Sequence, residues 1–150
     1  MEKEIIIKTQ EEMILLGMSI GKHIFGHSVL TLAGDLGAGK TTLTKGIGVG
    51  LGITRVITSP TFTILKQYPG RLSLSHFDAY RLEGQDTDLG FEEVLAGDDV
   101  CVIEWPTYMD SLLPKERLEI TITVLDQQYR KVHLHPIGQR YEQFCQEISI

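Results

Sequence analysis

Residues 34–41 read Gly34-Asp35-Leu36-Gly37-Ala38-Gly39-Lys40-Thr41 and match the pattern G-x-x-x-x-G-K-[ST] at every position. Glycines let the backbone curl so that successive N–H groups point into one concavity, where they bind phosphate oxygens. The apolar stretch Ser28 to Ala33 precedes the motif as a buried-type strand, and a helix pattern from Thr41 to about Leu51 follows it. Strand, glycine-rich loop and helix in this order predict a phosphate-binding loop.

Each part of this loop has an expected role. The residues whose backbone we expect against the phosphates of a nucleotide are Asp35, Leu36, Gly37, Ala38 and Gly39. Lys40 should reach the β- and γ-phosphates, and the Thr41 hydroxyl should coordinate Mg²⁺. The helix that begins here adds the positive end of its dipole. The loop therefore predicts a nucleoside triphosphate bound with Mg²⁺.

Three glycines, Gly46, Gly48 and Gly50, fall inside the predicted helix. Each costs roughly 0.5–1 kcal/mol of helix stability relative to Ala. One interpretation is a helix packed very closely against the sheet or a partner. The favoured interpretation is a helix that is stabilised by burial and tolerates poor propensity. Gly52 suits the C-terminal end of this helix.

Working outward from the loop, hydrophobic periodicity and turn residues predict the other elements. On the N-terminal side we expect a strand from Glu4 to Lys8 and a helix that begins at Thr9, with Glu12 completing a capping box. On the C-terminal side the expected elements are a hairpin of Thr61–Tyr68 and Leu72–Asp78 around Pro69-Gly70, a helix over Asp88–Ala96, a strand over Val100–Glu104, a hairpin of Leu118–Leu125 and Tyr129–His135, and a helix over Gln139–Ile148. This order predicts one α/β domain over residues 1–150, a P-loop NTPase-like three-layer sandwich with a mixed sheet between helices and hairpins in the C-terminal half.

Composition narrows the class of protein. The chain has 150 residues, with 42% hydrophobic and 23% charged residues, which are ordinary values for a globular protein and exclude disorder. It has no apolar run long enough to span a membrane and no secretory signal at its N-terminus, and its two cysteines are too few for a disulfide scaffold. We therefore expect a cytoplasmic setting. The formal charge of −6 argues against a protein that grips nucleic acid unaided.

Nucleotide hydrolysis needs a carboxylate near Mg²⁺ and a group that positions the attacking water. Two predicted strand ends carry carboxylates, namely Asp78 after Ser75-His76-Phe77 and Glu104 after Val100-Cys101-Val102-Ile103. The second has the form of a Walker B strand with Glu in place of Asp. Spacing alone leaves open which of the two faces the metal, and either could instead cap its strand or pair with Arg81.

Other polar residues admit two interpretations each. Thr61, within Ser59-Pro60-Thr61-Phe62, is placed where a threonine can reach Mg²⁺ in other phosphate-loop proteins, and the alternative is a proline turn that leads into a strand. His76 could orient water or substrate, or be structural. Trp105 could stack on a ligand or partner, or pack in the core. Thr9 could approach the adenine, although helix capping is favoured.

Motifs that are missing from the sequence limit which nucleotide the protein binds and which reaction it catalyses. The chain contains no Asn, so an Asn-Lys-x-Asp guanine-reading motif cannot exist, and no Asp-x-x-Gly occurs. Adenine is therefore favoured over guanine. A small-molecule kinase of this size usually carries an arginine-rich lid, and no arginine cluster is present, which weakens that alternative without removing it.

Four stretches of the sequence carry a combined pattern. In order they are Gly34-Asp35-Leu36-Gly37-Ala38-Gly39-Lys40-Thr41-Thr42-Leu43, Ser59-Pro60-Thr61-Phe62, His76-Phe77-Asp78-Ala79-Tyr80-Arg81-Leu82 and Val102-Ile103-Glu104-Trp105-Pro106. Together they resemble the TsaE family of small bacterial ATPases. The resemblance spans roughly residues 9–125 and is far more specific than the phosphate loop alone. Gly48 and Gly50 depart from the family pattern, and the stretch after Asp126 carries little recognisable pattern.

The resemblance implies roles for particular residues. Lys40 would bind phosphate and act in catalysis, Thr41 and Glu104 would be the Mg²⁺ ligands, and Thr42 would also lie at the nucleotide. Asp78 would lie beside the γ-phosphate and assist water activation, while Thr61 would act as a switch residue. The cofactors so implied are ATP and Mg²⁺.

The resemblance also implies a pathway and partners. Members of this family are required for making threonylcarbamoyladenosine in tRNA and work with the transferase subunit TsaD and its relative TsaB, with ATP hydrolysis resetting that complex. We expect a slow ATPase that its partners stimulate, that meets tRNA only indirectly and that has no membrane contact. The alternatives are a small-molecule kinase and a nucleotide-dependent interaction protein that does not hydrolyse. Residues Tyr129-Arg130-Lys131 could contact nucleotide or partner, although an exposed strand face is favoured.

Overall fold

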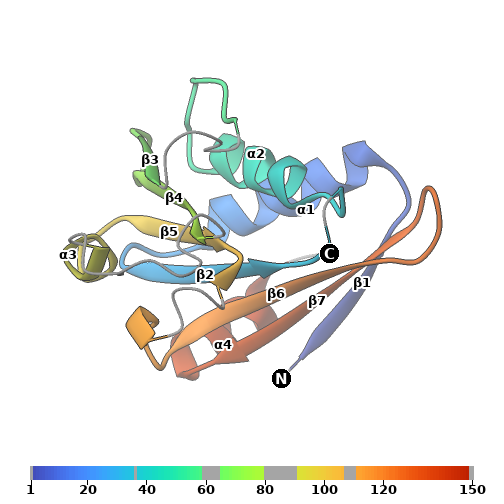
Figure 1. Ribbon diagram of the computed structural model, residues 1–150. Helices are drawn as coiled ribbons and strands as arrows, with labels where there is room; N and C mark the ends of the chain where they lie inside the picture. Colours follow the sequence, from blue (N-terminus) through green and yellow to red (C-terminus); the bar gives the residue numbers. More distant parts are fainter. Residues whose placement is uncertain (1, 36, 59–64, 80–90, 107–110, 149–150) are drawn as a thin grey trace.

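The computed structural model describes residues 2–35, 37–58, 65–79, 91–106 and 111–148. Helices lie on both faces of a mixed sheet, and the long α1 and α2 lie side by side on one face (Figure 1). The elements in chain order are β1 (Lys3–Ile7), α1 (Gln10–His23), β2 (Ser28–Ala33), α2 (Lys40–Gly50), β3 (Leu65–Tyr68), β4 (Leu74–Asp78), α3 (Phe91–Leu95), β5 (Val100–Glu104), β6 (Arg117–Val124), β7 (Arg130–Ile137) and α4 (Gln139–Glu147). The predicted α/β fold is confirmed.

The seven strands form one sheet in the order β1-β7-β6-β2-β5-β4-β3. β2 pairs in parallel with both β5 and β6, and β5 pairs in parallel with β4. The outer pairs β3–β4, β6–β7 and β1–β7 are antiparallel. β2 and β5 are buried at nearly every position because central parallel strands are covered on both faces. Both predicted hairpins and the mixed direction of the sheet are therefore confirmed.

The carboxyl ends of the central strands meet at one edge of the sheet. Leu32 of β2 and Asp78 of β4 both pair in register with Glu104, the last residue of β5. The loop that starts at Gly34 leaves β2 at the same edge. Ligands of open α/β sheets bind at this edge because the loops that follow parallel strands gather there.

The N-terminus of α1 agrees closely with the prediction from the sequence. Thr9 adopts extended backbone, and its Oγ1 accepts a hydrogen bond from the N–H of Glu12 at 3.1 Å. The Glu12 carboxylate accepts from the N–H of Lys8 at 3.3 Å, one residue before the N-cap of an ideal capping box. At the far end of α2, Gly52 has a φ of +79°, as expected for a helix-terminating glycine.

The glycines of α2 are explained by the crossing of α1 and α2. A Cβ built on Gly46 would lie 3.0 Å from Gly17 Cα, and one on Gly50 would lie 2.8 Å from Gly21 Cα. The two helices thus contact each other backbone to backbone. The favoured interpretation, a helix that merely tolerates poor propensity, is wrong for Gly46 and Gly50, because any larger residue would force the helices apart. Gly48 is different, since its added Cβ would meet the side chain of Ile57.

The C-terminal residues, which carry little recognisable pattern, complete the fold. β7 lies between β6 and β1, and α4 covers the sheet face opposite α1 and α2 (Figure 1). α4 buries Tyr141, Phe144 and Cys145, and the Tyr141 hydroxyl accepts a hydrogen bond from the N–H of Val29 at the start of β2. Both faces of the central strands are therefore shielded from water.

Two sequence expectations differ at their bounds. The helix expected over Asp88–Ala96 is the shorter α3, and residues 80–90 lie outside the described residues. The hairpin expected from Thr61 begins in the described residues at Leu65. Among the described residues no helix is long and apolar enough to cross a membrane.

Candidate functional site

The glycine-rich loop joins β2 to α2 and takes conformations that side chains rarely adopt. Gly37 has a φ of +82° and Gly39 a φ of +115°, and Gly39 is the N-cap of α2. Gly39 has no side chain to cap this helix, so the first N–H groups of α2 receive no hydrogen bond from their N-cap residue. The Ala38 N–H, in contrast, already donates to the carbonyl oxygen of Asp35 at 3.0 Å. A loop of this form presents an uncapped helix N-terminus to an anion.

Lys40, at the start of α2, is buried and points back across the loop. Its Nζ donates to the carbonyl oxygen of Gly34 at 2.6 Å and lies 3.8 Å from the centre of the Trp105 ring. Burial lowers the pKa of Lys40, while the negative charges of Glu104, Asp78 and Asp35 act in the opposite direction and raise it. The ammonium is therefore held among three carboxylates and an aromatic face.

Trp105 follows β5 directly and has a φ of +58°, which is a strained conformation for a bulky residue. Its N–H donates to the carbonyl oxygen of Leu32 at 3.3 Å. The side chain is half-buried, with the ammonium of Lys40 over its ring. The backbone turn places the indole beside the loop, and stacking on a ligand or partner stays a prediction.

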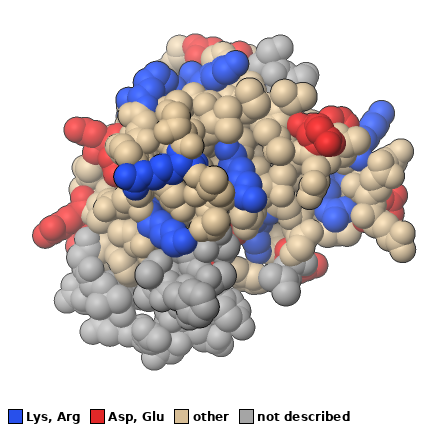
Figure 2. All heavy atoms as spheres, turned by 90° about the horizontal axis from the view of Figure 1, so that it is seen from above, with Lys and Arg blue, Asp and Glu red and all other residues tan. Residues whose placement is uncertain are grey.

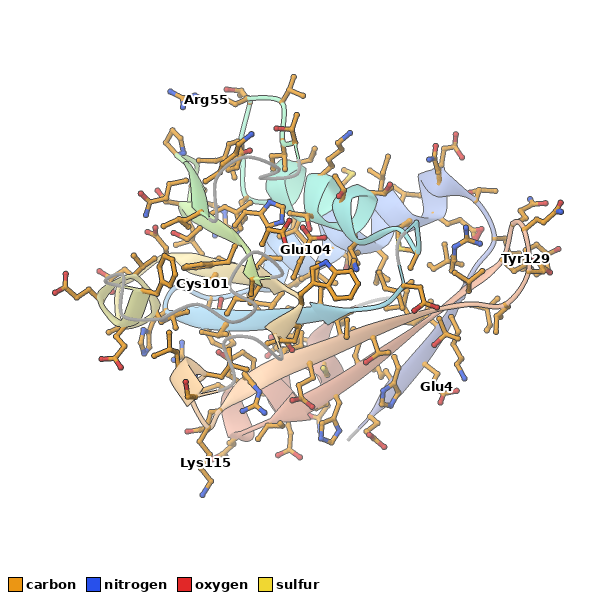
Figure 3. All side chains as sticks on the ribbon, in the orientation of Figure 1. Glu4, Arg55, Cys101, Glu104, Lys115 and Tyr129 are labelled. Atoms are coloured by element: carbon orange, nitrogen blue, oxygen red, sulfur yellow. The ribbon has the colours of Figure 1, made fainter. Side chains whose placement is uncertain are left out.

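The two candidate carboxylates lie on adjacent strands. Asp78 is opposite Glu104 in the parallel pairing of β4 with β5. Glu104 is 4% exposed, and its Oε2 is 2.8 Å from Nε2 of His76, which is fully buried. Figure 3 shows Glu104 on the side of the sheet that α2 covers. Both carboxylates act on Lys40 through their negative charge, and each raises the pKa of its ammonium.

An open pocket of about 120 Å³ lies beside the loop, on the side of α1. Its lining consists of Ile7, Thr9, Gln10, Met13, Gly37, Ala38, Gly39, Thr42, Gln128 and Arg130. Thr9 therefore both caps α1 and faces this pocket. Thr42, predicted at the nucleotide, lies in the pocket wall.

For Arg130 the favoured prediction, a position on an exposed strand face, is wrong. The sequence favours an exposed strand face for residues 129–131, and Tyr129 is exposed at the tip of the β6–β7 hairpin (Figure 3). Arg130, however, is half-buried, and its Nε donates to the carbonyl oxygen of Ala38 at 3.2 Å. The side chain reaches the loop because β7 runs beside β6, a neighbour of β2. No local pattern signals this contact.

The structure brings together most of the predicted site residues. Asp35, Gly37, Ala38, Gly39, Lys40, Thr41 and Thr42 lie on the loop and the first turn of α2, and Asp78 and Glu104 end the adjacent strands. Leu36, Thr61 and Arg81 lie outside the described residues. Among the described residues no group of three or more His, Cys, Asp or Glu side chains is arranged to hold a metal ion by itself.

Comparisons with known proteins agree on one family. The model of the family described as "Threonylcarbamoyl adenosine biosynthesis protein TsaE" matches residues 7–132. The tRNA threonylcarbamoyladenosine biosynthesis protein TsaE of Bacillus subtilis is 51% identical over 122 residues, which are 81% of this chain and 77% of the relative. The protein of the same name from Treponema pallidum is 40% identical over 129 residues, 85% of this chain and 96% of the relative. The crystal structure of Bacillus subtilis YdiB superposes with a TM-score of 0.88 at 39% identity, covering 99% of this chain and 94% of the other.

Proposed function

This chain belongs to the TsaE family of tRNA threonylcarbamoyladenosine biosynthesis, and from that premise we propose that it is an Mg²⁺-dependent ATPase of that pathway. The observation that supports the proposal is the meeting of the Gly34–Thr41 loop with Asp78 and Glu104 at one edge of the sheet. A phosphate cradle, a lysine and two carboxylates in one place are the parts that phosphoryl chemistry requires.

The loop fits a polyphosphate. A Cβ on Gly37 would meet no heavy atom of the described residues within 4 Å beyond its chain neighbours, so among these residues there is space beside the loop for a ligand. The uncapped N-terminus of α2 supplies N–H groups and the positive end of the helix dipole. Lys40 leaves its contact with the Gly34 carbonyl oxygen to bind the β- and γ-phosphates, because a phosphate is the stronger partner for an ammonium.

The neighbouring oxygens fit Mg²⁺. The Thr41 hydroxyl, in the first turn of α2, and the Glu104 carboxylate, at the end of β5, are the hard oxygen ligands that Mg²⁺ prefers when it is also bound to phosphate. The ion would neutralise negative charge on the phosphates. Asp78 would assist water activation beside the γ-phosphate, and Lys40 would stabilise the charge that develops there. Thr61 would complete the site as a switch residue.

The pocket between the loop and α1 is where we propose that adenine lies. It adjoins Gly37–Gly39, so a nucleotide whose phosphates occupy the loop can extend into it. Thr9 and Gln10 offer polar groups and Met13 offers an apolar surface, a combination suited to a purine. Asp35 and Leu36 would lie along the same loop against the phosphates.

Hydrolysis is proposed to serve a partner complex. As the family resemblance implies, the chain would act on TsaD and its relative TsaB in the cytoplasm, with tRNA bound by those partners. Turnover of the isolated chain should be slow because the partners complete the site.

Steady-state ATPase assays with and without a purified TsaD–TsaB pair test the proposal. We expect the pair to increase the ATPase rate of the wild-type protein and to leave that of Lys40→Ala unchanged. Glu104→Ala should lose Mg²⁺-dependent turnover, and calorimetry with ATP in Mg²⁺ and in EDTA separates that defect from loss of nucleotide binding. Intact ATP binding with negligible turnover in the presence of the pair would contradict the proposal in favour of an interaction protein. Transfer of the γ-phosphate to a metabolite instead of water would support a kinase.

A further inference from the structure

His76 occupies a position in β4 where an apolar residue would be expected. Its side chain is fully buried, and its neighbours on the same strand and on β5, Leu74 and Val102, are buried and apolar. His76 pairs in register with Val102, so its ring lies on the sheet face that also carries Glu104, two residues further along β5. The imidazole thus reaches diagonally from β4 to the carboxylate at the end of β5.

The contact between the two side chains is a directed hydrogen bond. Nε2 of His76 lies 2.8 Å from Oε2 of Glu104. A carboxylate can only accept hydrogen bonds, so Nε2 carries the hydrogen and donates it. That bond engages Oε2, and Oε1 is the second acceptor oxygen of the carboxylate.

Placing an imidazole here has a cost. Its second nitrogen, Nδ1, is buried and has no hydrogen-bond partner among the described residues. A buried polar group without a partner destabilises the folded state, because it has given up its hydrogen bond to water. An apolar side chain would avoid that cost, so packing alone does not account for a histidine at this position.

We propose that His76 is a positioning residue that holds the Glu104 carboxylate for the cation of the nucleotide complex. The Nε2–H fixes Oε2 and leaves Oε1 available as a metal ligand, a role that rests on the proposed Mg²⁺-dependent function. Residues that hydrogen-bond to a metal ligand restrict its orientation, and their loss typically weakens metal binding by roughly 10–100-fold. His76 acts through Glu104 and does not itself touch the nucleotide.

Two substitutions separate this role from packing. His76→Gln keeps an N–H donor at about the reach of Nε2, whereas His76→Leu keeps a buried side chain of similar size without a donor. The quantity to measure is the ratio of the ATP dissociation constant in EDTA to that in Mg²⁺, obtained by calorimetry. We expect His76→Leu to lower this ratio roughly tenfold or more with little change of affinity in EDTA, and His76→Gln to retain it.

The outcomes discriminate between the inference and its premise. An unchanged ratio in His76→Leu, an equal loss in both variants, or equal weakening with and without Mg²⁺ would overturn the positioning role. Wild-type protein that binds no ATP in either buffer would contradict the proposed function itself. Thermal unfolding of each variant identifies one that does not fold.

A second measurement needs neither nucleotide nor a stable leucine variant. Nitrogen-15 NMR of wild-type protein without nucleotide should show His76 with the hydrogen on Nε2, and Glu104→Gln should shift that Nε2 signal while the other histidines stay unchanged. A hydrogen on Nδ1 alone, or an Nε2 signal insensitive to Glu104→Gln, would overturn the inference even if Mg²⁺ binds.

Discussion

At the scale of single residues, the site is defined by charges in a confined space. Lys40 lies under Trp105 and beside the Gly34 carbonyl oxygen, close to the carboxylates of Glu104 and Asp78. The sequence identified each of these side chains by its place in a motif. It could not show that the ammonium has protein partners of its own, since these come from three different loops and strands.

Lys40→Ala should abolish nucleotide binding and leave the fold intact. The substitution removes an ammonium that forms charge-assisted hydrogen bonds to the β- and γ-phosphates, each worth roughly 1.5–3 kcal/mol, so affinity should fall by about 100-fold or more. Calorimetric titration with ATP measures the loss. Lys45→Ala is the matched control, because Lys45 is exposed on the same helix, and it should bind ATP as wild type does. Equal affinities of the two variants would contradict the role of Lys40.

The buried thiol of Cys101 should make the free energy of unfolding depend on pH. Burial, helped by the charge of Asp99, raises the pKa of its thiol from 9.0 to about 12. Below pH 9 the Cys101 thiol is protonated in both the folded and the unfolded protein, so it does not affect stability. Between about pH 9 and 12 the thiol loses its proton only in the unfolded chain. The free energy of unfolding should therefore fall in that window by up to about 1.4 kcal/mol per pH unit.

Guanidinium unfolding under reducing conditions at pH 8, 9 and 10 measures this effect. Cys101→Ala is the control, since it should show a shallower fall than wild type. The raised pKa values of Cys145 and Tyr141 are common to both proteins and cancel in the difference. Parallel pH profiles would show that Cys101 does not cause the alkaline loss.

At the scale of elements, the crossing of α1 and α2 affects the site, because the phosphate loop leads directly into the N-terminus of α2. The glycines of both helices allow their backbones to touch, so the position of the loop depends on α1. From the sequence, these residues read as poor helix formers. The backbone contact that requires them depends on where α1 lies.

Gly46→Ala should destabilise the protein although alanine is the better helix former. The added Cβ would collide with the Ile14 carbonyl oxygen and lie 3.0 Å from Gly17 Cα, both of them backbone atoms that cannot move independently. Overpacking of this kind costs roughly 1–3 kcal/mol and exceeds the propensity gain of about 1 kcal/mol.

Gly48→Ala is the control on the same helix. Its Cβ would meet Cδ1 of Ile57, the end of a flexible side chain that can turn away, so the substitution should be close to neutral. Thermal unfolding of the two variants measures the difference, with about 2–4 °C expected per kcal/mol for a chain of this size. Equal melting temperatures would contradict the backbone contact.

At the scale of the whole molecule, charge is unevenly distributed. The chain has 14 Lys and Arg against 20 Asp and Glu, yet residues 36–77 contain no Asp or Glu. Figure 2 shows Lys and Arg side chains gathered over the face that α1 and α2 form, with Asp and Glu mostly toward its margins. The rest of the chain carries the other 9 Lys and Arg together with all 20 Asp and Glu.

The isolated chain should bind tRNA weakly or not at all at physiological salt. A net charge of −6 opposes association with a polyanion, and the few basic side chains of one face lose their effect as salt screens them. A gel-shift assay with purified protein and tRNA at about 150 mM salt measures this, with the same assay in the presence of a TsaD–TsaB pair as the comparison. A tight, salt-resistant complex of the chain alone would contradict the view that partners hold the tRNA.

The sequence by itself determined the parts that depend on local chemistry. The loop at residues 34–41, the capped start of α1, both hairpins and the strand that ends at Glu104 follow from spacing and residue type within a few positions, because backbone conformation there is dictated by near neighbours. Tertiary structure alone decided the order of the strands, the approach of Arg130 to Ala38, the contact of Gly17 with Gly46 and the pairing of His76 with Glu104. These contacts join residues 28 or more positions apart, and which distant segments meet is set by how the whole sheet buries its two faces, which no single stretch of sequence encodes.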